Sequence, residues 1–251
     1  MEQLLAPIVS ANEMWPGVHL LWARAPEIAQ EAKPGQFVMV RCGNTLNPLL
    51  RRPISIHQAR GDQIALLFQV VGKGTEWLSE RTKGDNLDLL GPLGKGFHVD
   101  ETSSHLLLMA GGIGIAPLAF LAEKALNDGR SVDMILGART AARLYPKRLL
   151  PRRAEVLLVT EAGSKGEMGM ATHFTGRFAD RVDQVFACGP AAMYRSLRDC
   201  HELNRKQVQI SLEVMMGCGV GACYGCTVMT ASGARQVCKD GPIFDLKDIS
   251  R

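Results

Sequence analysis

The first hundred residues alternate short apolar stretches with turn-forming residues. The stretches are rich in Val, Ile, Leu and Phe, and Gly, Pro and Asp residues separate them. Several short strands with this punctuation are typical of a small antiparallel barrel. The predicted strands lie around residues 4–9, 18–22, 36–41, 54–57, 64–71 and 87–90.

The pattern changes near residue 100. Continuous apolar runs of strand length now alternate with longer stretches of helical periodicity, which indicates a parallel sheet covered on both faces. The predicted strands lie at 105–110, 132–137, 155–160 and 184–188, and the predicted helices at 115–126 and 190–203.

From about residue 211 the chain becomes rich in Gly and Cys, with short strands around a loop. The sequence therefore predicts an α+β multi-domain protein with three units. These are an antiparallel β-barrel (1–100), an α/β domain with a parallel sheet (101–210) and a small C-terminal module (211–251).

The formal net charge of the 251 residues is only +4. Nucleic-acid binding usually requires a clustered, strongly basic face, so we expect no such partner. The densest basic run, at residues 147–153, is interrupted by apolar residues and favours a solvated face; a docking patch for a phosphate or a partner is the alternative. No apolar run approaches the roughly 18 residues of a membrane span. The N-terminus lacks the features of a secretory signal, so a cytoplasmic location is expected.

Four of the seven cysteines crowd into one stretch: Cys218, Cys223, Cys226 and Cys238. Their spacing, C-x4-C-x2-C followed by a distant fourth cysteine, is that of plant-type 2Fe–2S ferredoxins. Structural zinc also takes four cysteines, but its sites usually show two C-x2-C pairs, and this chain has one. The spacing therefore favours a 2Fe–2S cluster over zinc.

The residues between these cysteines suit a loop that curls around a cluster. Gly219, Gly221 and Gly225 can adopt positive φ angles and allow close approach. Backbone N–H groups of such a loop can donate hydrogen bonds to the sulfurs.

Two motifs in the barrel region suit a diphosphate. Residues 52–55 read R-P-I-S on a predicted strand after a turn at Asn47-Pro48, and an Arg side chain can form a fork to phosphate oxygens. Residues 72–75 read G-K-G-T before a helical segment at 76–80, where backbone N–H groups attract phosphate. Taken singly, an edge strand and a capped turn explain the two motifs as well.

Two glycine loops follow predicted strands of the α/β region. Gly111, Gly112 and Gly114 lie between a strand and a helix, where parallel sheets bind nucleotides, although the motif is not G-x-G-x-x-G. Cys188-Gly189-Pro190 follows another strand and precedes another helix. Two such loops on one sheet predict a nucleotide site. Cys188 is a candidate neighbour of a nicotinamide ring, and an ordinary buried cysteine is the commoner explanation.

No catalytic residue is expected in this chain. The six histidines show neither ligand spacing nor a catalytic pairing, and no nucleophile elbow or metal-hydrolase signature is present.

The order R-P-x-S, G-x-G-T, G-G-x-G-x-x-P and C-G-P resembles the ferredoxin–NADP reductase superfamily over roughly residues 1–205. The run C-G-V-G-A-C-Y-G-C with the later C-K-D-G-P-I-F resembles the electron-transfer subunits of NAD-dependent dihydroorotate dehydrogenase. The resemblance then spans nearly the whole chain. It implies FAD and a 2Fe–2S cluster as cofactors, NAD as substrate, and FAD-binding, NAD-binding and 2Fe–2S roles for the three predicted units.

The resemblance also implies site residues. The four clustered cysteines would hold the cluster, and Cys188 and Gly189 join the glycines of the first loop at the nicotinamide nucleotide. Thr160-Glu161-Ala162-Gly163-Ser164 lacks the Asp expected after the Glu, so the choice between NAD and NADP stays open. The residues implied for FAD are Arg52, Pro53, Ile54, Ser55, Leu67, Phe68, Gln69, Gly74 and Thr75.

The implied function is electron transfer in pyrimidine (UMP) biosynthesis. Electrons would leave the FMN of a separate dihydroorotate dehydrogenase catalytic subunit, cross the 2Fe–2S cluster and collect on FAD for delivery to NAD+. The resemblance implies a heterotetramer of two plus two subunits, in which this chain alone does not oxidise dihydroorotate. The alternatives are a reductase subunit of an NAD(P)H–ferredoxin or sulfide dehydrogenase type, and a zinc-stabilised adaptor without flavin.

Overall fold

The computed structural model describes residues 1–43 and 49–249, and the predicted turn at Asn47-Pro48 lies outside this range. The described chain forms two compact units, each built from several segments. The first contains 1–96, 213–228 and 234–242, and the second contains 97–212, 229–233 and 243–251. The residues of the predicted C-terminal module are divided between these two units. The assignment of one cofactor to each of three domains stays a proposal.

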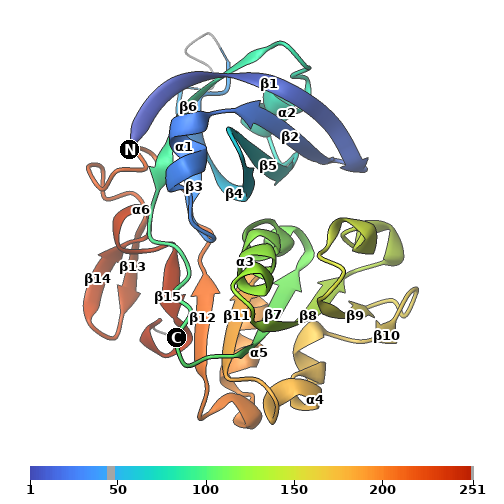
Figure 1. Ribbon diagram of the computed structural model, residues 1–251. Coiled ribbons are helices and arrows are strands. Elements are labelled where there is room, and N and C mark those ends of the chain that lie inside the picture. The colour runs from blue at the N-terminus through green and yellow to red at the C-terminus, as the bar shows by residue number, and fades with distance from the viewer. Residues whose placement is uncertain (44–48, 250–251) are drawn as a thin grey trace. The chain divides into compact units, whose positions relative to one another are not determined.

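The first unit is built on a closed antiparallel barrel, drawn in blue to green in Figure 1. The prediction of an antiparallel barrel is confirmed, and each of its strands matches one of the predicted apolar stretches. Two short helices, α1 (Pro26–Glu31) and α2 (Lys73–Ser79), belong to the same unit. In barrel order the strands are β1 (Glu2–Trp15), β2 (Val18–Arg24), β5 (Gln63–Gln69), β4 (Arg52–Arg60), β3 (Phe37–Val40) and β6 (Asn86–Leu93).

The second unit is built on a seven-stranded sheet in the order β10-β9-β8-β7-β11-β12-β15. All neighbours pair in parallel except β12 and β15. The parallel sheet was predicted, whereas β10, β12 and β15 were not. The strands are β7 (His105–Gly111), β8 (Ser131–Ala138), β9 (Glu155–Thr160), β10 (Glu167–Met168), β11 (Gln184–Cys188), β12 (Gln207–Ser211) and β15 (Ile243–Asp245).

Helices and single turns connect the strands of this sheet. Helix α3 (Ile115–Asn127) matches its prediction, while α5 (Ala191–Arg198) ends earlier than the predicted 190–203, with a separate turn η5 (His201–Leu203). The remaining elements are α4 (Gly176–Ala179), α6 (Val237–Asp240), the strands β13 (Thr227–Thr230) and β14 (Gly233–Gln236), and the turns η1 (Gly112–Gly114), η2 (Ala141–Arg143), η3 (Lys147–Leu149), η4 (Ala171–Phe174) and η6 (Leu246–Asp248).

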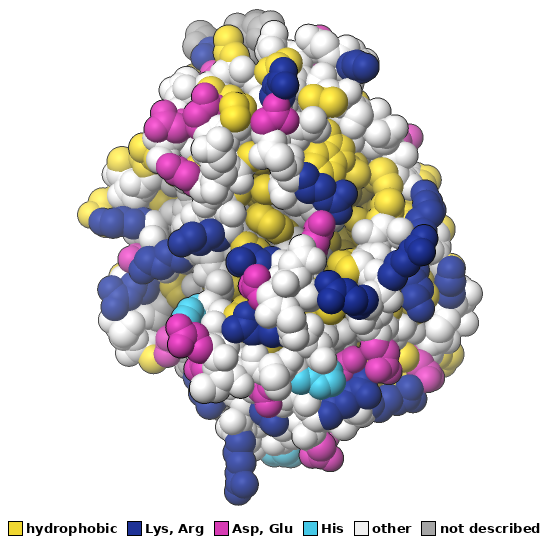
Figure 2. Space-filling view, in the orientation of Figure 1, with side chains coloured by type: hydrophobic (Ala, Val, Ile, Leu, Met, Phe, Trp, Pro, Cys, Tyr) yellow, Lys and Arg dark blue, Asp and Glu magenta, His cyan; other side chains and the backbone are white. Residues whose placement is uncertain are grey.

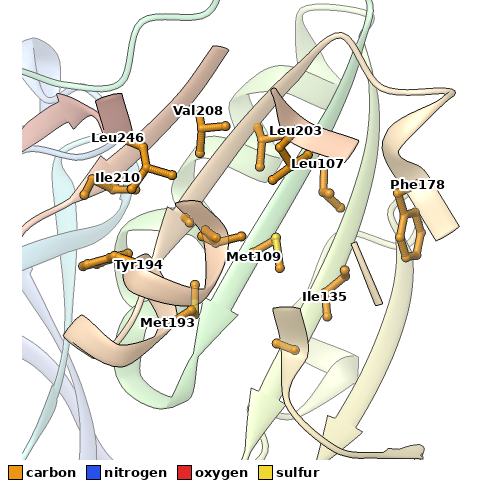
Figure 3. Packing of buried hydrophobic residues seen from close by; sticks show 14 of the residues in the cluster. Leu107, Met109, Ile135, Phe178, Met193, Tyr194, Leu203, Val208, Ile210 and Leu246 are labelled. Atoms are coloured by element: carbon orange, nitrogen blue, oxygen red, sulfur yellow. The ribbon is translucent and has the colours of Figure 1, made fainter. Parts of the chain in front are cut away.

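A buried hydrophobic cluster of the second unit lies between the sheet and the elements α4 and α5. Leu107, Met109 and Ile135 from the sheet face Met193 and Tyr194 from α5 (Figure 3). Burial of these side chains removes apolar surface from water, which is the main stabilising contribution to such a fold. The core therefore anchors α5 directly behind the end of β11.

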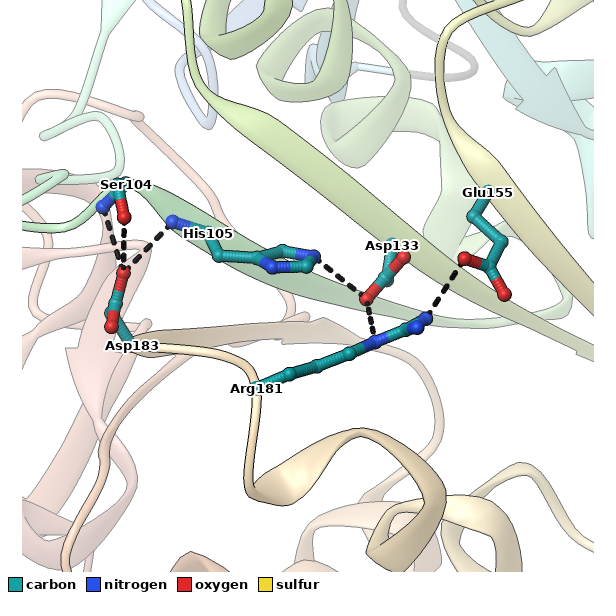
Figure 4. Close-up of polar contacts among 6 residues, drawn as sticks. All are labelled: Ser104, His105, Asp133, Glu155, Arg181 and Asp183. Carbon is teal, nitrogen blue, oxygen red and sulfur yellow. Dashed lines mark hydrogen bonds and ion pairs between the residues drawn. The ribbon is translucent and has the colours of Figure 1, made fainter.

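Hydrogen bonds and ion pairs between charged side chains link the strands at the amino-terminal ends of β7, β8 and β11. The buried carboxylate of Asp133 accepts hydrogen bonds from Arg181 Nε (2.9 Å) and pairs with His105 Nε2 (2.8 Å), and Arg181 also reaches Glu155 (3.0 Å; Figure 4). Asp183 accepts the backbone N–H groups of Ser104 and His105, both at 2.8 Å. The contacts with His105 and Arg181 satisfy the buried charge of Asp133.

Charged side chains of both signs lie on the face of the molecule drawn in Figure 2. Lys and Arg side chains lie next to Asp and Glu side chains over much of the face drawn in Figure 2. Among the described residues, no helix is both long and apolar enough to span a membrane.

Candidate redox-cofactor sites

The loop between β12 and β13 carries three of the four clustered cysteines, and α6 carries the fourth. Backbone N–H groups point at the sulfurs of Cys218, Cys226 and Cys238. Cys218 Sγ accepts from the N–H groups of Val220 (3.4 Å), Ala222 (3.3 Å) and Cys223 (3.4 Å). The N–H of Gly221 donates to Cys238 Sγ at 3.1 Å, and the N–H of Cys238 donates to Cys226 Sγ at 3.4 Å.

These hydrogen bonds change the acidity of the thiols. Burial alone would raise the pKa of Cys218, but hydrogen bonds from Val220, Cys223 and Ala222 outweigh it and lower the pKa to about 6. Burial, a hydrogen bond with Cys226 and nearby sulfur charge instead raise the pKa of Cys238 to about 12. The hydrogen bonds of Cys238 with Cys226 and Gly221 place α6 against the loop. An iron–sulfur cluster requires thiolates, and N–H donors to sulfur suit that charge.

The backbone of the loop adopts the left-handed conformation at three places. Gly219 (φ 76°) and Gly221 (φ 82°) do so as expected. The expectation is wrong for Gly225, because its neighbour Tyr224 takes the positive φ (59°) instead. An aromatic residue in this region is uncommon, and such strain gathers at functional sites.

The cluster loop packs on the barrel within the first unit. A Cβ on Gly219 would lie 2.5 Å from Met39 Cγ and 3.3 Å from a Leu93 methyl carbon, so the loop touches strands β3 and β6. Gln236 Nε2 donates to the carbonyl of Gly221 at 2.9 Å. In the described residues, no group of three or more His, Cys, Asp or Glu side chains is arranged to hold a single metal ion.

The two predicted diphosphate motifs of the barrel lie together. The guanidinium of Arg52, on β4, lies against Gly74 at the start of α2, where a Cβ would come 2.5 Å from Arg52 Nε. Thr75 Oγ1 accepts the N–H groups of Val71 (2.9 Å) and Gly72 (3.2 Å) and fixes this turn. An arginine beside a glycine turn provides positive charge and a close backbone approach, so these residues fit the diphosphate of FAD.

The other residues implied for FAD lie on the same two strands. Pro53, Ile54 and Ser55 follow Arg52 on β4, where Ile54 is buried and Pro53 and Ser55 are half-buried. Leu67 and Phe68 on β5 are buried and Gln69 is exposed. Sequence reasoning overlooked Arg51, whose Nη2 donates to both carboxylate oxygens of Asp88 of β6, each at 2.9 Å. This ion pair links the residue before β4 to β6, so of the two adjacent arginines Arg52 is the candidate for a ligand.

The two glycine loops of the sheet meet at the carboxyl ends of β7 and β11. A Cβ on Gly114 would collide with the carbonyl oxygen of Cys188 and lie 2.9 Å from the nitrogen of Gly189. A Cβ on Gly189 would come 3.1 Å from Gly111 Cα. Gly112 has a positive φ of 57°. The structure thus brings together Gly111, Gly112, Gly114, Cys188 and Gly189.

This meeting point is the topological switch point of the sheet. The chain leaves β7 towards β8 on one side and leaves β11 towards β12 on the other. Ligands of open parallel sheets bind in the crevice at such a point. The glycine loops therefore fit a dinucleotide, and the half-buried Cys188 lies at the centre of that edge.

Two further features of this edge have no signal in the sequence. Tyr194 of α5 holds the Gly189 turn through its hydroxyl, which accepts from Gly189 N at 3.0 Å. The loops after β8 and β9 are joined by hydrogen bonds from Glu161 N to Ala138 O (3.1 Å) and from Ala141 N to Ser164 Oγ (2.9 Å). Both depend on contacts between segments far apart in the chain.

Comparison with known proteins agrees with this geometry. The family described as the iron-sulfur cluster binding domain of dihydroorotate dehydrogenase B matches residues 213–250. An electron transfer subunit of dihydroorotate dehydrogenase B (NAD(+)) from Desulforamulus reducens is 39% identical over 248 residues, 95% of each chain. Its counterpart from Clostridium acetobutylicum is 40% identical over 216 residues, 85% of each chain.

Solved structures show the same fold. A structure of NADH-dependent reduced ferredoxin–NADP oxidoreductase superposes with a TM-score of 0.89 at 27% identity, over 98% of this chain and 90% of that one. A ferredoxin NADP+ reductase from Neisseria gonorrhoeae has a TM-score of 0.68 at 16% identity, over 84% and 98% of the two chains. The chain has the cysteine loop and the barrel, and its relatives are of nearly equal length. For these reasons it belongs to the family of dihydroorotate dehydrogenase B electron transfer subunits.

Proposed function

We propose that this chain is the electron-transfer subunit of an NAD-dependent dihydroorotate dehydrogenase. It carries electrons from the FMN of a separate catalytic subunit to NAD+, with FAD and a 2Fe–2S cluster as its own cofactors, in pyrimidine biosynthesis. The observation that carries the proposal is the set of backbone N–H groups directed at Cys218, Cys226 and Cys238 in a loop packed on the barrel.

The chain's own residues bind and orient the redox groups. When bound, the cluster supplies single-electron transfer, and FAD converts single electrons into the electron pair of a hydride. The N–H donors of the loop stabilise negative charge on sulfur. Arg52 balances the charge of a diphosphate, and the glycine turns at the switch point allow a nucleotide to approach the backbone.

The same loop supports docking of a partner. Cys223 is exposed beside Tyr224, which is 70% exposed, and Met215 (92%) and Val220 are exposed on the same segment. Exposed aromatic and apolar side chains are enriched in protein interfaces. We therefore propose that the FMN subunit binds at this loop, in a complex with two copies of each subunit.

A cytoplasmic location is part of the proposal. A reducing compartment suits four clustered cysteines that hold a metal cluster instead of forming disulfides.

The first experiment is an absorption spectrum of the anaerobically purified chain before and after NADH is added. We expect flavin and cluster bands that bleach with NADH. Addition of an FMN-containing dihydroorotate dehydrogenase subunit should then give dihydroorotate-dependent NADH formation, which the chain alone lacks. A colourless protein with stoichiometric zinc would contradict the proposal.

A second candidate is a reductase subunit that serves another complex. It is favoured by the TM-score of 0.89 to the NADH-dependent ferredoxin–NADP oxidoreductase structure. The cofactors would be the same and the partner different. NADH bleaching without any dihydroorotate activity in the reconstituted complex would support this candidate.

A further inference from the structure

The turn after β11 is held by a single tyrosine hydroxyl. Tyr194 lies in the first turn of α5 and is only 7% exposed. Its hydroxyl donates to the carbonyl of Ser211 at 2.6 Å and accepts the N–H of Gly189 at 3.0 Å. One side chain thus joins the end of β11, the start of α5 and the end of β12.

Packing alone does not explain this hydroxyl. The ring of Tyr194 fills the core beside Ile210 and Met193 (Figure 3), and a phenylalanine ring would fill the same space. Burying a hydroxyl costs free energy unless it is hydrogen-bonded, and here two backbone hydrogen bonds offset that cost. The contribution specific to the hydroxyl is the fixed orientation of the Gly189 peptide.

The turn is held on its other sides by close contacts. The carbonyl oxygen of Cys188 faces Gly114, where no side chain fits. Met193 Sδ lies 2.8 Å from the place of a Cβ on Gly189 and 3.1 Å from that of a Cβ on Gly111. Three elements therefore determine where the backbone of residues 188 and 189 lies. Among these contacts, only the hydrogen bond to the Tyr194 hydroxyl also sets the direction of the Gly189 N–H.

We propose that Tyr194 is a positioning residue that sets the Cys188-Gly189 turn against the nicotinamide end of the nucleotide. The inference rests on the proposed function, because it assumes that NADH binds at the switch point. Tyr194 does not touch the nucleotide; it acts through the Gly189 peptide. A displacement of about 1 Å at a reacting centre can slow a reaction about a hundredfold.

The test is Tyr194→Phe in the full-length, FAD-loaded chain, with stopped-flow reduction of FAD by NADH. We expect the limiting rate of FAD reduction to fall about tenfold, since the turn is loosened but not removed. The dissociation constant of ADP-ribose, which lacks the nicotinamide, should stay within about twofold, because the hydroxyl acts only at the nicotinamide end. The matched control is Leu197→Val, which trims a buried core residue of the same helix and should keep the wild-type rate.

An unchanged limiting rate in Tyr194→Phe would overturn the inference, as would an equal loss in Leu197→Val. Amide exchange of Gly189 in the wild-type chain is a second measurement that needs no variant. We expect this N–H to be protected, and free exchange would also overturn the inference. Failure of NADH to reduce the wild-type FAD would instead overturn the proposed function, and it would be seen before any variant is made.

Discussion

The cluster loop and the switch-point turns both depend on glycine, but for different physical reasons. Gly221 in the cluster loop has a φ of 82°, a conformation that other residues rarely adopt. Gly114 at the switch point has an ordinary helical φ of −59°, yet the carbonyl of Cys188 leaves no space for a side chain. The first glycine is required for its backbone conformation and the second for its small size.

The two regions also differ in the range of their polar contacts. Cys218 accepts hydrogen bonds from residues two to five positions further along the chain. Gly189 is fixed through Tyr194 to Ser211, across three separate elements. A local loop can be recognised from spacing, whereas a site assembled from distant segments cannot.

Loss of a cluster ligand should have the largest effect and separate the two regions completely. In Cys226→Ser we expect dihydroorotate-dependent NADH formation by the reconstituted complex to fall to background, because thiolate ligands hold the cluster. FAD reduction by NADH should persist, since it depends on the switch point. The absorbance of the cluster and both activities are measured, with Cys200→Ser as the control outside the cluster. Loss of both activities would show that the two regions are not independent.

Gly114→Ala should have the next largest effect, confined to the other region. The added methyl group collides with the Cys188 carbonyl, so the two turns must separate and FAD reduction by NADH should slow about a hundredfold. Gly129→Ala is the control, because Gly129 has a strained φ of 84° but open space around it. The control should lose about 1–2 kcal/mol of stability without loss of rate. Equal rates in the two variants would contradict the steric role of Gly114.

The same contrast explains what the sequence could predict. The apolar stretches located the barrel strands, and the C-x4-C-x2-C spacing located the candidate cluster ligands, because both signals are local. Strand β12 was missed because Gln207 and Gln209 interrupt its apolar positions, although Gln209 is buried and bonds to the backbone of His98. The assignment of positive φ to Gly225 failed because composition does not show which residue of a loop turns. Tyr194 had no motif at all, since its partners lie on two other elements.

Tyr224→Ala should weaken partner binding while leaving both cofactor regions intact. Alanine keeps the same backbone demand at φ 59° but removes the exposed ring. Interface tyrosines contribute about 1–2 kcal/mol, so we expect the dissociation constant for the FMN subunit to rise about tenfold. FAD reduction by NADH should be unchanged. Met168→Ala removes an equally exposed side chain from β10 and should not alter binding. Equal affinities of the Tyr224 variant and wild type would place the interface elsewhere.

Gly221→Ala tests whether the cluster loop depends on the left-handed backbone conformation of this residue. A left-handed alanine costs about 1–2 kcal/mol, and the N–H that donates to Cys238 would move with it. We expect lower cluster content per chain after purification, measured as iron and acid-labile sulfide. Gly225→Ala should retain full cluster content, because Gly225 has no positive φ and a Cβ there would lie 3.6 Å from Cys223 Sγ. Similar losses in both variants would mean that space, not conformation, limits this loop as well.

The smallest expected effect lies at the amino-terminal ends of the sheet strands, opposite the glycine loops. There a charged side chain contributes to stability alone. Hydrogen bonds from the N–H groups of His105 and Ser104 outweigh burial and hold the pKa of Asp183 below its usual value. Asp183→Ala should therefore cost about 1 kcal/mol at pH 7, partly screened by solvent because the residue is exposed. Since the folded pKa is the lower one, this contribution is complete above about pH 4–5 and is lost as pH falls through the folded pKa. Denaturation curves of the wild type and of Asp183→Ala at pH 7 and pH 3 measure this contribution to the free energy of unfolding. The curves of the two proteins should converge at pH 3, and FAD reduction by NADH should be unchanged at pH 7. A slower reduction in Asp183→Ala would show that the amino-terminal edge of the sheet also affects the nucleotide site.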